Sequence, residues 1–206
     1  MICGEALELP LFPAEEGGAS PTSPLQIKFV EIDKGVAASL YRKHHYLGDK
    51  GFLHQYTYGG LWHGEVICAI TYGIPNAHSI NGLYDKHNQH GVLEITRLVC
   101  DPRCPKNTPS RMIAITTRLL KKIYPLKLLI SYADTAQGHD GGIYKASNFR
   151  AHGLTAKKTD FVFPDGSIRK GRGIKYSELE GEWVPRSQKY LFSKKIEDDR
   201  FPPTGN

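Results

Sequence analysis

The sequence predicts a mixed α/β fold, in which one central sheet is flanked by helices. Apolar runs that fit strands alternate with amphipathic helical patterns in the order strand, helix, hairpin, strand, helix, strand, helix and strand. Strands joined through a helix are expected to be parallel, whereas the arms of the hairpin must be antiparallel. A doubly wound nucleotide-binding fold is disfavoured, because no glycine-rich phosphate turn follows the first strand.

The first half of the chain is expected to hold a strand, a short helix and a hairpin. Residues 27–32 fit a strand, and Asp33 is placed to cap a helix whose apolar positions run to Tyr41. Residues 55–62 and 65–72 fit the two arms of a hairpin. The second arm is apolar almost throughout, which is typical of a strand buried on both faces.

The middle of the chain predicts a strand–helix–strand–helix unit. Residues 92–99 and 126–133 fit strands, and the best helical pattern of the chain, 110–124, lies between them. A second helix is expected over 142–151, with Gly153 as its C-terminal cap. These two strands should therefore pair in parallel.

The C-terminal part predicts a β-hairpin extension. Residues 159–172 contain a Pro-Asp-Gly turn between strand-like runs, and 189–192 fit a last short strand. Residues 74–91 are polar and read as a loop or insertion. The expected organisation is a flexible arm, a single domain and a disordered tail, at 1–25, 26–195 and 196–206 respectively.

Charge is distributed unevenly along the 206 residues. The net charge is +6, but residues 27–195 carry +12 and the two ends are acidic. The densest positive charge, +7, lies in 142–195. A concentrated positive field suits a polyanion such as nucleic acid, with a basic protein that has no such partner as the alternative. No membrane partner is expected, because no run approaches the ~18 apolar residues of a membrane span and the N-terminus does not fit a signal peptide.

The four cysteines are Cys3, Cys68, Cys100 and Cys104. Without an export signal, a disulfide framework is not expected. Cys100 and Cys104 form a C-x3-C pair, but no second Cys or His pair stands at finger-like spacing, which disfavours a structural zinc site. Cys68 lies in an apolar strand pattern and is most simply a small core residue.

A candidate phosphate site lies where the strand ending near residue 99 leads into the best helix. Either Asn107 or Ser110 can cap this helix, whose free N–H groups can hold a phosphate. Lys106 and Arg111 add cations beside it. The alternative is an ordinary capped helix, in which Ser110 serves only its own backbone.

A second candidate site surrounds Asp134, just past the C-terminal end of a predicted sheet strand, where α/β sheets bind ligands. Its carboxylate could act as a general base, orient an amine or bind a metal. Tyr144 begins the next helix and could face the same cleft; otherwise the pair is a capping Asp and a packed Tyr. His45, beside His44, could act as a proton shuttle or ligand, although a lone surface His is usually neither.

A third candidate is the basic and aromatic segment that contains Arg169, Lys170 and Arg172. Cations beside aromatic rings suit DNA or RNA. The alternative is a solvated hairpin face, which is the commoner outcome for such a cluster.

Together these segments resemble a known family. The strand–helix–strand–helix unit resembles the core of GNAT-type acyltransferases. Within that superfamily, five segments resemble the phage Mu Mom family of DNA-modification proteins: HHYLG (44–48), GLWHGEVICAITYG (60–73), EITRLVCDP (94–102), ISYAD (130–134) and GHDGGIYKASNFRAHG (138–153). The resemblance spans roughly residues 40–153, and the last two segments are its most specific part.

The resemblance implies a GNAT-like sheet and an enzyme that converts adenine in duplex DNA to its N6-carbamoylmethyl form. Such an enzyme would protect phage DNA from host restriction in the cytoplasm of the bacterial host. Double-stranded DNA is the implied partner, with the target base flipped out of the helix, and a homodimer is compatible with the resemblance. An acyl-CoA-type donor such as acetyl-CoA and an iron ion are the implied cofactors. The usual GNAT pyrophosphate loop, R/Q-x-x-G-x-G/A, is absent, because 104–111 contains no glycine; a different donor therefore stays open.

The residues that the resemblance and the patterns single out fall into four groups. The catalytic candidates are Asp134, Tyr144, His45 and Ser110. The donor-binding candidates are Leu98, Val99, Lys106, Asn107, Ser110, Arg111 and Asn148. The substrate- and DNA-binding candidates are Tyr46, Trp62, Tyr72, Arg97, Arg169, Lys170 and Arg172. The candidate iron ligands are His45 and Asp134.

Two alternative functions stay open from the sequence. One is a conventional GNAT N-acetyltransferase that acts on a small amine or a protein. The other is a non-enzymatic DNA-binding anti-restriction protein. The GNAT fold alone does not decide between them and does not supply the carbamoylmethyl chemistry, which bonds nitrogen to a methylene carbon rather than to an acyl group.

Overall fold

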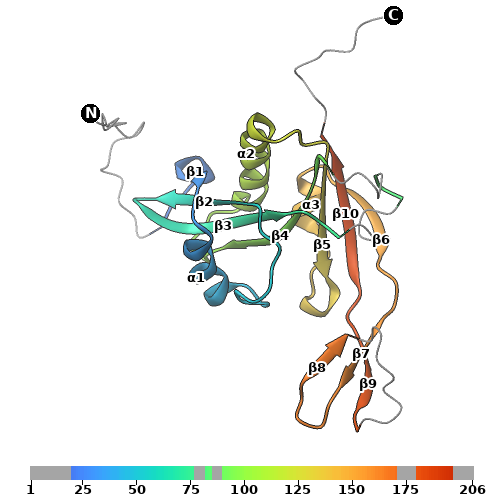
Figure 1. Ribbon diagram of the computed structural model, residues 1–206. Helices are drawn as coiled ribbons and strands as arrows, with labels where there is room; N and C mark the ends of the chain where they lie inside the picture. The colour runs from blue at the N-terminus through green and yellow to red at the C-terminus, as the bar shows by residue number, and fades with distance from the viewer. Residues whose placement is uncertain (1–19, 77–81, 85–89, 171–179, 197–206) are drawn as a thin grey trace, which may run out of the picture.

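A seven-stranded mixed sheet forms the centre of the fold in the computed structural model, which describes residues 20–76, 82–84, 90–170 and 180–196 (Figure 1). Its strands are β1 (Lys28–Glu31), β2 (Tyr56–Trp62), β3 (Glu65–Gly73), β4 (Val92–Cys100), β5 (Leu128–Asp134), β6 (Arg150–Leu154) and β10 (Lys189–Lys195). They lie in the order β1-β2-β3-β4-β5-β10-β6. Neighbours are antiparallel except β4 and β5, which are parallel. The predicted mixed sheet is therefore confirmed.

The helices and short helical turns lie between these strands. They are η1 (Pro24–Gln26), α1 (Lys34–His44), α2 (Thr108–Ile123), η3 (Thr135–Gln137) and α3 (Gly142–Ala146). The Asp33 side chain accepts the Gly35 N–H, so the predicted cap of α1 is confirmed. No helix among the described residues is long and apolar enough to span a membrane.

The two longer helices cover opposite faces of the sheet. Alternate residues of β3 point to opposite sides, so Ala69 packs with Tyr41 of α1, whereas Ile70 packs with Met112 and Ile113 of α2. Figure 1 shows β2, β3 and β4 passing between α1 and α2. Burial of β3 on both faces explains its nearly continuous apolar sequence.

Of the two predicted caps of α2, the structure confirms Asn107, and the helix starts two residues earlier than predicted. The helix begins at Thr108 rather than at Ser110, and its N-cap is Asn107 in the left-handed region with φ +71°. Ser110 lies inside the first turn and donates its hydroxyl to the Asn107 carbonyl at 3.0 Å. Ser110 is therefore not the cap.

The predicted helix over 142–151 is wrong in its second half. The helix ends at Ala146, and Asn148 adopts a left-handed φ of +60°, a conformation that commonly ends helices. Residues 150–154 instead form β6, which pairs with β10. Gly153 lies inside this strand and is not a helix cap. The backbone N–H and C=O groups of 150–154 make their hydrogen bonds with β10 instead of within a helix.

A separate three-stranded antiparallel sheet has the order β8-β7-β9. Its strands are β7 (Thr159–Val162), β8 (Ile168–Lys170) and β9 (Glu182–Pro185). Strands β7 and β8 confirm the predicted hairpin, and β9 was not predicted. Figure 1 shows this sheet extending away from the central sheet, beyond one end of β10. Phe161 is its buried centre, against Phe163 and Trp183.

Candidate functional site

One of two cavities in the candidate site begins where the parallel strands part. Strands β4 and β5 pair from Val92–Leu128 to Ile95–Ser131, and the Ser131 hydroxyl donates to the Ile95 carbonyl at 3.2 Å. Beyond this point lies a cavity of about 360 Å³, hereafter the first cavity. Its lining residues are 45–47, 94–98, 132–133, 138–144 and Lys189. It lies at the carboxyl edge of the parallel pair, which is the edge expected from the sequence.

Asp134 ends β5 beside the first cavity. Its carboxylate is buried, and both of its oxygens have polar partners. Its Oδ1 accepts the Ala136 N–H at 3.1 Å, and the Tyr46 hydroxyl donates to Oδ2 at 3.4 Å. Lys189 Nζ lies 3.6 Å from the same oxygen. Burial would raise the pKa of Asp134, but hydrogen bonds from Ser187 and Ala136 and the charge of Lys189 lower it below its usual value. Asp134 is therefore ionised at neutral pH, and it orients Tyr46 and Lys189, which both line the first cavity.

Glu94 is a candidate catalytic residue that the sequence analysis missed. It projects from β4 into the first cavity. Burial raises its pKa to about 7, although the positive charges of Lys189 and Arg97 oppose this rise. A carboxyl group with a pKa near neutrality is suited to accept a proton during catalysis. The signal was an acidic residue interrupting an apolar strand, Val92 to Val99, that enters the core of the sheet.

His45 and Tyr46 form an aromatic wall of the first cavity. Their rings stack with centroids 4.8 Å apart, and His45 Nδ1 accepts the Leu47 N–H at 3.1 Å. Burial, reinforced by the charges of Arg97 and His139, lowers the pKa of His45 to about 4. The imidazole is therefore neutral at pH 7. Burial and the Asp134 carboxylate raise the pKa of Tyr46 to about 12, which keeps its hydroxyl protonated.

The structure gives no support to the expected iron site at His45 and Asp134. Among the described residues, one group of three His, Cys, Asp or Glu side chains is close enough together to hold a metal ion. It consists of Cys68, Cys100 and Cys104 and does not include His45 or Asp134. His45 Nδ1 is already an acceptor for Leu47, and the Asp134 carboxylate is shared by hydrogen bonds and the Lys189 cation. A cation beside the carboxylate opposes a second cation there.

Tyr144 lies on α3 and also lines the first cavity. Its ring packs against Phe149 and Phe192, with centroids 5.6 and 5.3 Å away. Burial raises the pKa of Tyr144, a hydrogen bond with Ser131 opposes the rise, and the nearby Glu94 adds to it. The hydroxyl therefore stays protonated at the point where β4 and β5 part. The predicted placement of Tyr144 in the same site as Asp134 agrees with this geometry.

A second cavity of about 390 Å³ lies at the N-terminal end of α2. Four of the donor-binding candidates line it together: Asn107, Ser110, Arg111 and Asn148. Lys194 also lines it and donates Nζ to the Ser147 carbonyl at 2.9 Å, while Arg111 Nε donates to the Pro24 carbonyl at 3.1 Å. The left-handed Asn107 makes the tight turn into α2 that a glycine usually makes. Free helix N–H groups and two cations make this cavity suited to a phosphate group.

Some candidates of the catalytic and donor groups lie elsewhere. Ser110 lines the second cavity and is separated from the first, in which Glu94 and Tyr144 lie. Lys106 is exposed and lines neither cavity. Leu98 lines the first cavity, whereas the Val99 side chain is buried beneath α1.

The DNA-binding candidates are also divided by the structure. Tyr72 is wrong as a contact residue: it is fully buried, and its hydroxyl is 2.7 Å from Thr116 Oγ1 beneath α2. Trp62 packs on the core at the end of β2, against the His63 ring and outside both cavities. Arg97 lines the first cavity and donates to the Thr96 and Lys50 carbonyls, at 2.8 and 2.9 Å. Its buried Nε has no hydrogen-bond partner in the described part of the chain.

The basic hairpin residues are only partly described. Arg169 is exposed on β8, with its guanidinium 5.5 Å from the centre of the Phe163 ring. Lys170 ends the same strand, and Arg172 lies outside the described residues.

The parting parallel strands, with a cavity on β4 and a helix N-terminus beyond it, define the fold of the GNAT acetyltransferases. Agmatine N-acetyltransferase has a TM-score of 0.52 at 10% identity, covering 83% of this chain and 100% of that one. NAA60 of Arabidopsis thaliana, in complex with acetyl-CoA, has a TM-score of 0.52 at 16% identity, covering 82% and 98%. A GNAT-family acetyltransferase from Streptococcus pneumoniae has a TM-score of 0.51 at 14% identity, covering 83% and 99%.

Within this fold, the chain belongs to the Mom protein family, whose model matches residues 26–201. A curated relative, methylcarbamoylase mom of Escherichia phage Mu, is 24% identical over 163 residues. The match covers 77% of this chain and 59% of that relative, so the chain spans about three fifths of the relative's length. The resemblance stated from the sequence motifs is thereby confirmed at the level of family and fold.

Proposed function

We propose that this protein is a transferase that modifies the exocyclic N6 amine of adenine in duplex DNA. The observation that carries the proposal is the half-buried Glu94 carboxyl, with a pKa of about 7, in a cavity of about 360 Å³ walled by aromatic rings. Membership of the Mom family supports DNA as the substrate, through a relative that is named a methylcarbamoylase. The GNAT fold supports group transfer to an amine.

The size and walls of the first cavity suit a flipped base. An adenine inside the double helix cannot reach a carboxyl group that lines a cavity, so the base must leave the stack. The stacked pair His45–Tyr46 and the half-buried Tyr132 and Tyr144 provide flat surfaces for it. The cavity volume falls within the range of about 300–1,000 Å³ typical of small-molecule sites.

The chemistry that we propose begins with the poor nucleophilicity of the N6 amine, whose lone pair is conjugated with the ring. A base and a positioned electrophile are therefore needed. A new bond forms between N6 and the electrophilic carbon of the donor, Glu94 accepts the N6 proton, and the donor's leaving group departs with its electron pair. The Tyr144 hydroxyl hydrogen-bonds the oxygen or leaving group that gains negative charge. Ionised Asp134 holds Tyr46 and Lys189 in position.

The second cavity is the proposed site for the donor. Its helix N-terminus, Arg111 and Lys194 match the phosphates of an acyl-CoA-type donor such as acetyl-CoA. Transfer from acetyl-CoA would give an N6-acetyl amide. The carbamoylmethyl product requires a donor whose methylene carbon carries the leaving group. The proposal is the carbamoylmethyl product or a close N6 modification, and no step runs through iron.

The basic surface would hold the distorted duplex. Residues 27–195 carry a net charge of +12, and Arg169 is exposed on the three-stranded sheet. Phosphate contacts of this kind give affinity that falls with salt. A bulky N6 group in the major groove would block restriction enzymes that read adenine there, which is the proposed protective role.

The test is mass spectrometry of nucleosides from plasmid DNA recovered from cells that produce the protein. We expect a modified adenosine with wild type and with Glu182→Gln, a matched change at an exposed glutamate of β9, but not with Glu94→Gln. The mass gain distinguishes a carbamoylmethyl from an acetyl group. Unmodified adenosine in every sample that contains soluble wild-type protein would contradict the proposal.

The two alternative functions predict different behaviour. An N-acetyltransferase for a small amine or protein should bind acetyl-CoA but bind duplex DNA little at low salt, which calorimetry at two salt concentrations detects. A non-enzymatic anti-restriction protein should keep its activity after Asp134→Asn or Tyr144→Phe. We expect both variants to bind DNA and to lose most of their turnover.

A further inference from the structure

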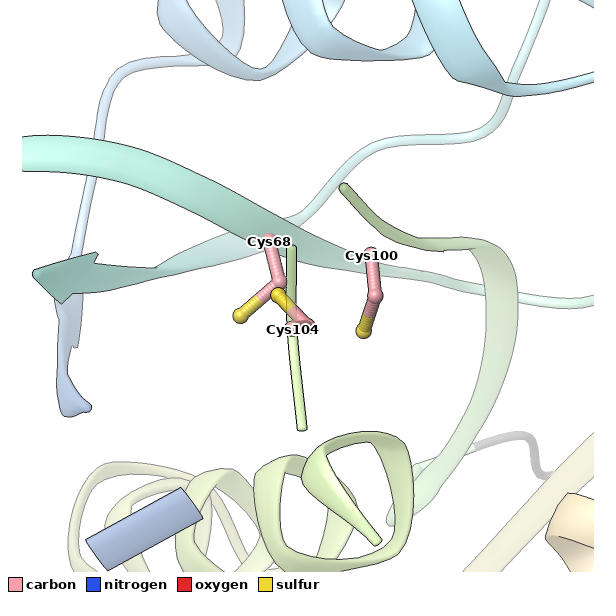
Figure 2. A group of neighbouring side chains, drawn as sticks. All are labelled: Cys68, Cys100 and Cys104. Atoms are coloured by element: carbon pink, nitrogen blue, oxygen red, sulfur yellow. The ribbon is translucent and has the colours of Figure 1, made fainter. Parts of the chain in front are cut away.

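Three thiols gather on the α2 face of the central sheet, away from both cavities. They belong to Cys68 on β3, Cys100 at the end of β4, and Cys104 in the loop that leads to α2. Figure 2 shows the three side chains converging from these separate segments. The three sulfur atoms all lie within 4.8 Å of one another, and none is in a disulfide.

The surrounding backbone fixes this arrangement. Cys68 and Cys100 are direct cross-strand partners in the antiparallel pair β3–β4. The loop is tied back to β3, because the Asp101 N–H donates to the Ile67 carbonyl at 2.8 Å and the Cys104 N–H donates to the Asp101 carbonyl at 2.9 Å. Gly60 on β2 leaves room beside Cys68, since a β-carbon there would overlap its sulfur. The fold therefore presets three convergent thiols rather than leaving them on mobile loops.

We propose that Cys68, Cys100 and Cys104 bind one thiophilic cation of the d10 class, Zn²⁺ or Cu⁺. Thiolates are the preferred ligands of these ions. Zinc–sulfur bonds of about 2.3 Å place tetrahedral sulfur ligands about 3.8 Å apart, so the widest pair here needs to close by at most about 1 Å. Cys68 is fully buried, whereas Cys100 and Cys104 are partly exposed. An ion can enter from that exposed side, where a water molecule would complete a zinc site; Cu⁺ is satisfied by three thiolates.

Such an ion would link β3 to the loop that begins α2. That loop leads directly from Cys104 to Asn107, where the lining of the second cavity starts. Metal binding would therefore stiffen the entry to α2 and take no part in group transfer. The inference is independent of the proposed function, because its test needs neither DNA nor a donor.

The test begins with full-length protein that has been reduced and freed of metal by a chelator. Zinc is titrated against a competing chromophoric chelator, Cu⁺ is titrated in the same way in a separate arm, and Co²⁺ serves as a spectroscopic probe of thiolate ligands. We expect one ion per chain, a thiolate charge-transfer band with Co²⁺ and a raised melting temperature. Cys100→Ser should lower the affinity at least about 100-fold. The matched control is Cys3→Ser, at a cysteine that is not part of the proposed ligand set and lies outside the described residues; it should leave binding unchanged.

A second measurement uses the wild-type chain and so does not depend on the folding of a variant. Zinc or Cu⁺ should protect Cys100 and Cys104, but not Cys3, from alkylation that is mapped by mass spectrometry. The proposal is overturned if wild type binds neither ion, or if Cys3→Ser weakens binding as much as Cys100→Ser. It is also overturned if Cys100 and Cys104 form a disulfide that the ions neither prevent nor compete with, which would identify a redox pair instead.

Discussion

The two cavities differ in the groups that they present, although α3 contributes to both. The first cavity presents Glu94 and Tyr144, together with the neutral His45, and burial perturbs the pKa of each. The second cavity presents Arg111 and Lys194 around a helix N-terminus. Buried acids and hydroxyls suit proton transfer, whereas cations and free N–H groups suit the holding of an anion.

This difference indicates that proton transfer and the binding of an anionic donor take place in separate cavities of this protein. Where β4 and β5 part, Glu94 lines the first cavity half-buried, and this burial raises its pKa. The start of α2 instead presents the partly exposed cations Arg111 and Lys194, which can bind an anion. Substitutions in the first cavity should therefore act on turnover, and substitutions in the second on donor affinity.

The largest effect is expected from Glu94→Gln, which should lower turnover by about 10²–10⁴-fold. Glutamine cannot accept the amine proton. Because the base acts when deprotonated, the wild-type rate should rise with pH through about 7 and then level off. Rates measured across neutral pH should show that this rise is absent from the variant. A wild-type rate that does not change across neutral pH would remove Glu94 from the proton-transfer step.

Asp134→Asn should lower turnover by about 100-fold, mainly through misplacement of Tyr46 and Lys189. Asparagine can still accept the Ala136 N–H, so the fold should persist. Asp165→Asn, in the exposed turn between β7 and β8, is the matched control. If Asp134→Asn kept full turnover and an unchanged melting temperature, catalysis in the first cavity would not need this negative charge.

Arg111→Ala should raise the KM for the donor about 10-fold and leave kcat nearly unchanged. Loss of one cation weakens anion binding without touching the groups that move protons. Arg118→Ala, at an exposed position of the same helix, should leave both constants unchanged. If Arg111→Ala lowered kcat as strongly as Glu94→Gln does, the assignment of separate roles to the two cavities would be wrong.

The smallest effect is expected from Arg169→Ala on the three-stranded sheet. Duplex DNA affinity should fall about threefold and its dependence on the logarithm of salt concentration should weaken by about one unit, because one phosphate contact is lost. Titrations at several salt concentrations measure both quantities, with Lys122→Ala at the end of α2 as the control. An unchanged salt dependence would exclude Arg169 from the DNA surface.

Much of the fold followed from local patterns. The strand-like runs of β2 and β3, the helical stripe of α2 and the Asp33 cap are local features, and each formed the expected element. The helix predicted over 142–151 failed because a free edge of β10 was available to pair with residues 150–154. The prediction that Tyr72 contacts DNA failed because the sequence motif does not show that α2 covers this side chain.

The candidate site was found in part. Asp134 and Tyr144 were identified because an acid at a strand end and a tyrosine at the next helix start are visible in the sequence. Glu94 was missed because its importance depends on its burial, and its pKa reflects the surroundings that β5 and Lys189 provide. The cysteine spacing likewise showed two thiols of the cluster, and β3 supplied the third.

The sequence by itself determined the order of strands and helices as far as α3, the hairpin of β2 and β3, the family resemblance and the position of an acid at the edge of the sheet. These depend on side-chain period and on short motifs, which act over a few residues. Only the tertiary structure decided which acid has a pKa near neutrality, which thiols converge and which aromatic residues lie beneath a helix. Those properties depend on burial and on through-space distances between residues far apart in the chain.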